Sequence, residues 1–422
     1  MNYSSGSIKE TYLDPSNFSQ SRCVFKLSGD MNYLSNMKLT QLGATTTVAA
    51  AGYSRSAGMR SLIRNIMLMD GGTVLTQSRE QNLDAALRNV LGANDNNLST
   101  KTGLDFNRQA YTYGKYVDPA GVANTFRKGY SATSYSSNEI ALLEVNSSRG
   151  TMILSDALPL LRVLPMLDNS VFKDGLSLVI EWETDIRKIA DSDANAVTIL
   201  QPVLCAYEVS DPMLYAQLAI KPGSLSWVER EVDQRPYAAA TTLTQRYNGF
   251  DNKHVTRLCV VKQIQDLNLY VSTDAVQGVG PLSSVVLSQE SYNIVNQGRR
   301  LFPRDISNFD INRQTINAFG DFSVFNGAIQ ARGFTATSSP HYIDSLNTRL
   351  GNFDNADMVP GLCGYNGVLM GNVPVRNLEL TLSRDLTNVD AFQSQPLNVF
   401  LFGDVPKVMS VGRDGSYLIA YV

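Results

Sequence analysis

Charged side chains are scarce in this sequence, at 18% of its 422 residues, and no run of five or more like charges occurs. The 36 lysines and arginines nearly balance the 39 aspartates and glutamates, leaving a formal charge of −3. A surface dedicated to nucleic acid normally carries a basic excess or a basic stripe. Direct binding of nucleic acid is therefore not expected.

Long apolar runs are also missing. None approaches the roughly 20 residues that a helix needs to cross a bilayer. The first residues contain no basic start followed by an apolar stretch, so no secretory leader is predicted. We expect the protein to be made and used on the cytosolic or nuclear side.

The usual catalytic motifs are absent. The chain has two histidines, His254 at the start of a predicted strand and His341 after a proline, and neither belongs to a metal-ligand motif. Neither a Gly-x-Ser-x-Gly elbow nor a Walker A loop occurs, and the lone Gly278-Val-Gly280 is typical of a loop. We expect no catalytic, cofactor-binding or metal-binding residues and no enzymatic activity.

Cysteine pairs are missing too. The four cysteines are far apart in apolar or small-residue surroundings: Cys23, Cys205, Cys259 and Cys363. Buried reduced thiols are the favoured interpretation, and a disulfide is the alternative.

The sequence is rich in short apolar segments bounded by Gly, Pro, Asn, Asp or Ser, which is typical of β-strands. Alternation is clearest where Leu178, Ile180 and Trp182 fall on one face of a strand. The predicted strands are 23–27, 37–42, 62–69, 176–182, 197–209, 255–264, 267–271, 285–287, 293–295, 378–382, 397–402 and 417–421. Asp414-Gly415 predicts a hairpin turn before the last of them.

Helices are few. Ser78 and Gln81 match a capping box at the start of a short amphipathic helix that ends near Gly92. Its apolar face contains Leu83, Leu87, Val90 and Leu91. Residues 158–167, interrupted by two prolines, predict helical turns or irregular structure. Residues 93–138 show no periodicity and predict a long surface excursion that serves contacts between molecules.

The two halves of the chain repeat one pattern. Val24 is followed 39 positions later by Ile63, and Val255 is followed 39 positions later by Ile294. The strand at Leu176 is followed 21 positions later by Val197, and the strand at Leu378 is followed 19 positions later by Leu397. Copies of about 200 residues, each made of short strands, fit two jelly rolls in tandem.

This pattern predicts an all-β chain of two eight-stranded jelly-roll sandwiches with a few short helices and long loops. We expect an N-terminal arm at residues 1–20 and a first jelly roll at 21–215, which contains the insertion near 93–138. A linker at 216–240, rich in proline and charge, would lead to a second jelly roll at 241–422.

Two residue groups allow a binding or catalytic interpretation. Glu181 and Glu183 lie two positions apart on a strand, as a glycosidase pair could, although a solvated outer strand face is favoured. Trp227 and the tyrosines of 111–116 could form a platform for sugar or for another subunit. Within the excursion a subunit contact is favoured, and burial in the core is the third option.

The pattern resembles the double jelly-roll major capsid proteins of adenoviruses, tailless membrane-containing phages, virophages, polinton-like elements and large eukaryotic DNA viruses. The segments that carry the resemblance are 62–72 with the short helix from Arg79, 176–183, 200–207, 292–303 and 397–402. The resemblance covers the chain from about residue 20 onward.

The resemblance implies a homotrimer that forms pseudo-hexagonal capsomers on an icosahedral lattice, in a virion assembled in the host cytoplasm or nucleus. Minor capsid or penton proteins, and an underlying membrane, are the partners that it allows. No cofactor is implied. The alternative function is a carbohydrate-binding β-sandwich, either a lectin or a viral attachment protein.

Overall fold

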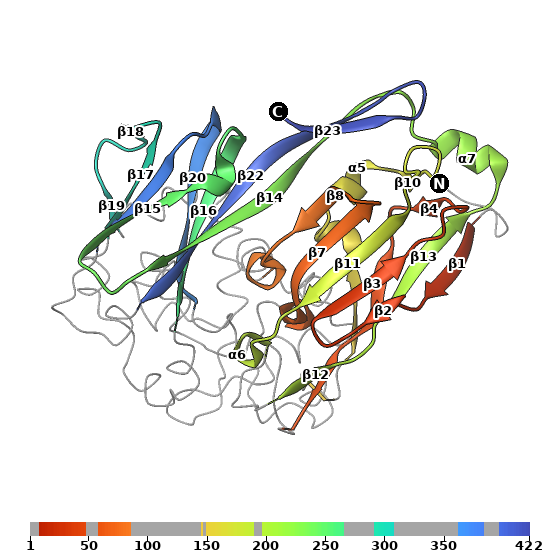
Figure 1. The fold of residues 1–422 in the computed structure, drawn as a ribbon, viewed down its shortest axis with the longest axis horizontal. Coiled ribbons are helices and arrows are strands. Elements are labelled where there is room, and N and C mark those ends of the chain that lie inside the picture. Colours follow the sequence, from red (N-terminus) through yellow and green to blue (C-terminus); the bar gives the residue numbers. More distant parts are fainter. Residues whose placement is uncertain are drawn as a thin grey trace, which may run out of the picture.

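A computed structural model describes residues 8–47, 58–85, 145–146, 149–189, 196–265, 291–307, 362–383 and 396–422. These residues form two antiparallel β-sandwiches, one coloured red to yellow-green and the other green to blue in Figure 1. No helix in the described part of the chain is long and apolar enough to span a bilayer. The predicted strands at 267–271 and 285–287 and the excursion at 93–138 lie outside the described residues.

The first sandwich is built from two sheets of antiparallel strands. One sheet has the order β10 (Met166–Leu167), β4 (Tyr33–Leu34), β13 (Val203–Val209), β5 (Lys38–Leu42) and β9 (Gly150–Ile153), with β1 (Ile8–Leu13) also paired to β13. The other has the order β2 (Asn17–Phe18), β3 (Arg22–Lys26), β11 (Leu176–Trp182), β7 (Ile63–Asp70) and β8 (Thr73–Ser78). A small ladder joins β6 (Ala44–Thr46) to β12 (Val197–Ile199).

The second sandwich repeats this plan. One sheet has the order β14 (Gly223–Tyr237), β22 (Leu397–Val411), β16 (His254–Ile264) and β20 (Leu362–Pro374), with β23 (Tyr417–Tyr421) also paired to β22. The other has the order β15 (Thr242–Tyr247), β21 (Leu378–Ser383), β17 (Ser291–Asn296) and β18 (Arg299–Arg300), with β19 (Ile306–Ser307) paired to β17. The two tandem jelly rolls predicted from the sequence are confirmed.

Each sandwich has its own apolar core. The alternation predicted for β11 is confirmed, because Leu178, Ile180 and Trp182 are all buried in the first core. In the second core, Val399 and Leu401 of β22 are buried. Phe400 and Phe402 of the same strand are also buried but point to its other face, with their ring centroids 6.3 Å apart. The continuous apolar run in β22 therefore reflects a strand covered on both faces.

Corresponding strands occupy corresponding positions in the two sandwiches. The order β1, β13, β5, β9 matches β14, β22, β16, β20, and the order β3, β11, β7, β8 matches β15, β21, β17, β18. The counterpart of β3, which holds Val24, is therefore β15 and not the strand of Val255. The pairing of Val24 with Val255 was therefore wrong. The two spacings of 39 start from strands that are not equivalent, so their equality is a coincidence.

The structure contains β-strands in both segments that were predicted to lie outside the jelly rolls. Residues 1–20 were expected to form an arm, but β1 pairs with β13 along its whole length. Residues 216–240 were expected to form a linker, but β14 pairs with β22 at all 15 of its positions. The connection is instead α7 (Pro212–Leu218), where Asp211 caps the helix by accepting from the Met213 amide and proline occupies the first turn.

The remaining helical turns are short: η1 (Gly58–Leu62), η3 (Leu154–Asp156), α5 (Leu160–Val163), α6 (Ile186–Ile189) and η4 (Asn248–Phe250). Helical turns within 158–167 are confirmed by α5. The helix predicted from Ser78 begins at Gln81 instead and is described to residue 85, with Leu83 buried. The Ser78 hydroxyl does contact the Gln81 side chain. Leu87, Val90, Leu91 and Gly92 lie outside the described residues.

The predicted strand 197–209 is two strands, β12 and β13, which are separated at Pro202. Proline has no amide hydrogen for a ladder, so the break falls there. The hairpin at Asp414-Gly415 is confirmed between β22 and β23. Gly415 has a φ of 77°, which glycine adopts without strain.

Candidate functional site

The two sandwiches are joined by a ribbon made of the far ends of β14 and β22 together with β23. Figure 1 shows β14 and β22 running diagonally from the second sandwich to a position above the first. β22 pairs with β16 up to Asp404 and with β23 from Lys407 onward. The ribbon side chains that pack into the core of the first sandwich are Leu225, Trp227, Met409, Val411, Tyr417 and Ile419.

A buried carboxylate lies where this ribbon meets β8. Glu229 is 0% exposed and accepts hydrogen bonds from Thr76 Oγ1 at 2.9 Å, Trp227 Nε1 at 3.2 Å and Lys407 Nζ at 2.7 Å. Because Thr76 belongs to the first sandwich and the other groups to the ribbon, Glu229 ties the two together. Trp227 is thus buried in the joint, which is the third of the options that the sequence left open.

Lys407 connects Glu229 to a second acidic residue. Its ammonium lies 3.1 Å from Glu231, which is also paired with Lys253. Burial alone would lower the pKa of Lys407, but Glu229 and Glu231 outweigh it and the pKa is raised. Burial likewise raises the pKa of Glu231, and the two lysines overcome this effect and leave it lowered. Both residues are therefore held in their charged forms.

A second ion network lies beside the first. Arg230 donates from Nη1 to Asp84 at 2.9 Å and from Nε to Asp404 at 2.8 Å. Asp84 follows β8 in the first sandwich, whereas Asp404 lies on β22, where it also binds Arg257 at 2.6 Å. Burial alone would lower the pKa of Arg230, but the attraction of Asp84 and Asp404 is stronger, and the pKa is raised. We call the two networks together the ionic joint: Thr76, Asp84, Glu229, Arg230, Glu231, Lys253, Arg257, Asp404 and Lys407.

The ionic joint can fix how the two sandwiches sit relative to each other. Neighbouring residues on β14 point to opposite sides of the strand, so Glu229 and Arg230 reach β8 and Asp84 by different sides. A hydrogen bond on one side, from Thr76 to Glu229, and an ion pair on the other, between Arg230 and Asp84, together resist rotation of the ribbon about its own axis. In the described ranges, no group of three or more His, Cys, Asp or Glu side chains is placed to hold a metal ion.

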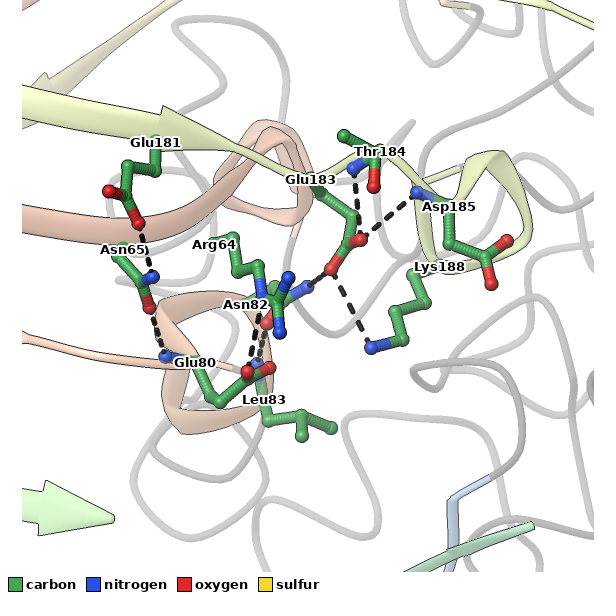
Figure 2. A network of polar contacts seen from close by, with 10 residues as sticks. All are labelled: Arg64, Asn65, Glu80, Asn82, Leu83, Glu181, Glu183, Thr184, Asp185 and Lys188. Carbon is green, nitrogen blue, oxygen red and sulfur yellow. Dashed lines mark hydrogen bonds and ion pairs between the residues drawn. The ribbon is translucent and has the colours of Figure 1, made fainter. Parts of the chain in front are cut away.

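Glu181 and Glu183 belong to a separate polar network, shown in Figure 2. A β-bulge in the pairing of β11 with β7 falls between Glu181 and Trp182. Glu181 accepts from Asn65 Nδ2 at 2.6 Å and lines a hollow of about 340 Å³. Glu183 is 4% exposed, so its expected position on a solvated face was wrong.

The carboxylate of Glu183 closes the turn after β11. It accepts from the backbone amides of Thr184 and Asp185, each at 3.0 Å, and from Asn82 Nδ2 at 2.8 Å, and Lys188 lies 3.7 Å away (Figure 2). These two amides precede α6, so the carboxylate stabilises the turn that leads into that helix. In the described part of the chain, Glu183 does not line the hollow beside Glu181, which gives no support to a glycosidase pair there.

Replacing Glu183 with alanine is expected to lower the free energy of unfolding by about 2 kcal/mol, because two backbone amides and Asn82 lose a buried charged acceptor. The matched control, Glu181→Ala, removes a half-buried carboxylate with one partner and should cost less than about 1 kcal/mol. Urea unfolding followed by fluorescence measures both. Equal losses would contradict the role of Glu183 in stabilising the turn after β11.

The other residues singled out in the sequence lie apart from the joint or outside the described part. His254 begins β16. Three described cysteines, Cys23, Cys205 and Cys259, are buried and free. His341, Gly278-Val-Gly280 and the tyrosines of 111–116 lie outside the described residues, as does the side chain of Cys363.

The ionic joint itself was missed by the sequence reasoning. Its signal was the charged run 229–235, which was interpreted as part of a linker. Val228 precedes this run and Val232 lies within it, so the segment also contains the β-branched residues that favour a strand.

Comparison with known proteins gives a result only at the level of structure, since no family model and no curated protein matches the sequence. The mavirus major capsid protein matches 100% of this chain and 91% of its own length, with a TM-score of 0.54 and 8% identity. VP54 of PBCV-1, fitted into a reconstruction of the virophage Sputnik, matches 100% of this chain and 98% of its own length, with a TM-score of 0.52 and 11% identity. The chain therefore has the double jelly-roll fold of viral major capsid proteins.

Proposed function

We propose that this protein is the major capsid protein of a virus and builds a shell from trimeric, pseudo-hexagonal capsomers. The observation that carries the proposal is the match of two tandem jelly rolls, over the whole chain, to a mavirus major capsid protein of nearly the same extent. Two similar sandwiches per chain give six similar units in a trimer, which is the number that a hexagonal tile needs.

The ionic joint supports this role physically. A tile must present its six sandwiches at fixed angles, and a chain whose two sandwiches moved freely would give tiles of varying shape. Glu229 and Arg230 bind groups of both halves, so each chain would enter a trimer with its two sandwiches already oriented. We also propose that the division between the jelly rolls falls at α7, with β14 in the second of them, because β14 pairs with β22 at all 15 of its positions.

The further parts of the proposal follow from the capsid role. The protein would act in the virion as a structural subunit without enzymatic activity. It would contact other copies of itself, minor capsid or penton proteins, and an underlying membrane where one is present. No described feature favours the carbohydrate-binding alternative, because Trp227 is buried in the joint.

The purified protein is expected to be a stable trimer, about three times the chain mass of 46.3 kDa. Mass photometry at nanomolar concentration, checked by analytical ultracentrifugation at micromolar concentration, measures this mass directly. A clean monomer at micromolar concentration would overturn the capsomer proposal. A glycan array on the same sample should show no specific binding.

A further inference from the structure

The strand β23 has one edge open to solvent. It pairs with β22 through five residues, and no backbone hydrogen bond to its other edge is found in the described part of the chain. All five residues line a groove of about 660 Å³, which is also lined by residues of β7, of β8 and of the segment 171–174. Leu418 is 68% exposed and Tyr421 is 49% exposed, so this part of the strand can be reached by another molecule.

The backbone groups that face the groove can be identified from two backbone hydrogen bonds of the hairpin. Gly412 donates its amide to Ser416, and the Val422 amide donates to Pro406. In an antiparallel ladder, alternate residues bond to the same neighbour. Residues 416, 418, 420 and 422 thus bond to β22, and the N–H and C=O groups of Tyr417, Ile419 and Tyr421 point into the groove.

The composition of β23 is unusual for an exposed edge. Its sequence, Tyr-Leu-Ile-Ala-Tyr, has neither charge nor proline, and Leu418 is 68% exposed. Proteins normally protect exposed edges with charged residues or proline. The edge strand β1 is protected in this way by Lys9 and Glu10, and the edge strand β14 by its charged run.

We infer that β23 pairs in antiparallel fashion with β23 of a second copy of this chain, and so links one capsomer to another. The register centred on Ile419 places Tyr417 opposite Tyr421 of the partner subunit. Every outward-facing backbone group then meets another outward-facing group, which gives about six hydrogen bonds. Because an isologous contact opposes each strand with itself, a charged strand would repel its copy, whereas this one does not.

The same register explains why Leu418 is exposed in a single chain. Leu418 lies opposite Ala420 of the partner subunit, and the small alanine leaves room for the leucine side chain. Both residues bond to their own β22, so they form a non-hydrogen-bonded pair across the contact, in which side chains approach most closely. The pairing would cover the exposed leucine of each copy at once.

Leu418→Lys tests the contact without disturbing the core, since the side chain is exposed. The wild-type protein should show a species of twice the capsomer mass that grows with concentration. The variant should weaken this association at least about tenfold, because two lysines then meet and two leucines lose their cover. Val228→Lys is the matched control, since Val228 is 47% exposed on β14 and away from the open edge, and it should leave the association unchanged.

A disulfide experiment tests the register. Leu418→Cys mixed with Ala420→Cys should give a cross-linked pair of chains under mild oxidation, whereas Leu418→Cys mixed with Val228→Cys should not. Capsomers that never double in mass, or a cross-link that forms equally in both mixtures, would overturn the inference. The capsomer proposal is judged separately by the mass of the single capsomer. A doubled mass that survives Leu418→Lys would assign the contact to another surface.

Discussion

Arg230→Ala is expected to lower the free energy of unfolding by about 3–5 kcal/mol, the range for breaking a buried ion pair by removing one partner. The change leaves Asp84, 1% exposed, and Asp404, 4% exposed, without the cation that lies between them. Arg257 still neutralises part of the charge on Asp404. The substitution should therefore mainly weaken the contact between the two sandwiches.

Because Arg230 lies between the two sandwiches, Arg230→Ala should have a second measurable effect. Trp182 lies in the first core and Trp227 in the ribbon, so the chain's two tryptophans report on different places. In the wild type, urea unfolding followed by fluorescence and by circular dichroism should give coincident transitions. In Arg230→Ala the ribbon should detach first, and the two probes should separate.

Arg246→Ala is the matched control for the loss of a guanidinium. Arg246 pairs with Asp251 at 3.3 Å and its side chain is half exposed, so the change should cost less than about 1 kcal/mol. Its transitions should stay coincident. A similar loss in both variants would show that the contacts of Arg230 do not hold the sandwiches together.

The sequence predicted the strands well because most of them obey one local rule. Alternating apolar residues in β11 and the continuous run in β22 reflect burial on one face and on two faces, and both can be recognised within a few residues. The sequence could not show in the same way which strand of one sandwich corresponds to which strand of the other. That correspondence depends on which strands pair, and a spacing of 39 between two apolar segments contains no information about pairing.

The ionic joint was hidden for a related reason. Thr76 and Glu229 are 153 positions apart, and Arg230 and Asp84 are 146 apart. Charges that find buried partners so far away in the chain look the same in the sequence as charges in a solvated linker. The burial of Glu183 could not be predicted from the sequence either, because one of its partners, Asn82, is 101 positions away in the chain.

Lys407→Met is expected to cost about 3–5 kcal/mol, the other large effect in this chain. Methionine keeps much of the length of the lysine side chain but leaves Glu229, which is 0% exposed, with only Thr76 and Trp227 as partners. These two are neutral donors and do not compensate for a buried negative charge. Lys253→Met is the control, because Glu231 then still has Lys407, and it should cost about 1 kcal/mol.

Removing the unpaired charge of Glu229 should restore much of the stability that Lys407→Met loses. Glu229→Gln in the Lys407→Met background keeps an acceptor for Trp227 and Thr76 and no longer buries an unpaired carboxylate. The double variant should therefore be more stable than Lys407→Met alone, with a coupling of about 1–3 kcal/mol in a double-mutant cycle of urea unfolding. Additive losses would mean that the two side chains do not act on each other, and that packing of the lysine stem accounts for the cost of Lys407→Met. A rescue would show that the charge of Lys407 is needed because Glu229 is buried against β8, where its carboxylate also accepts the hydrogen bond of Thr76 that joins the ribbon to the first sandwich.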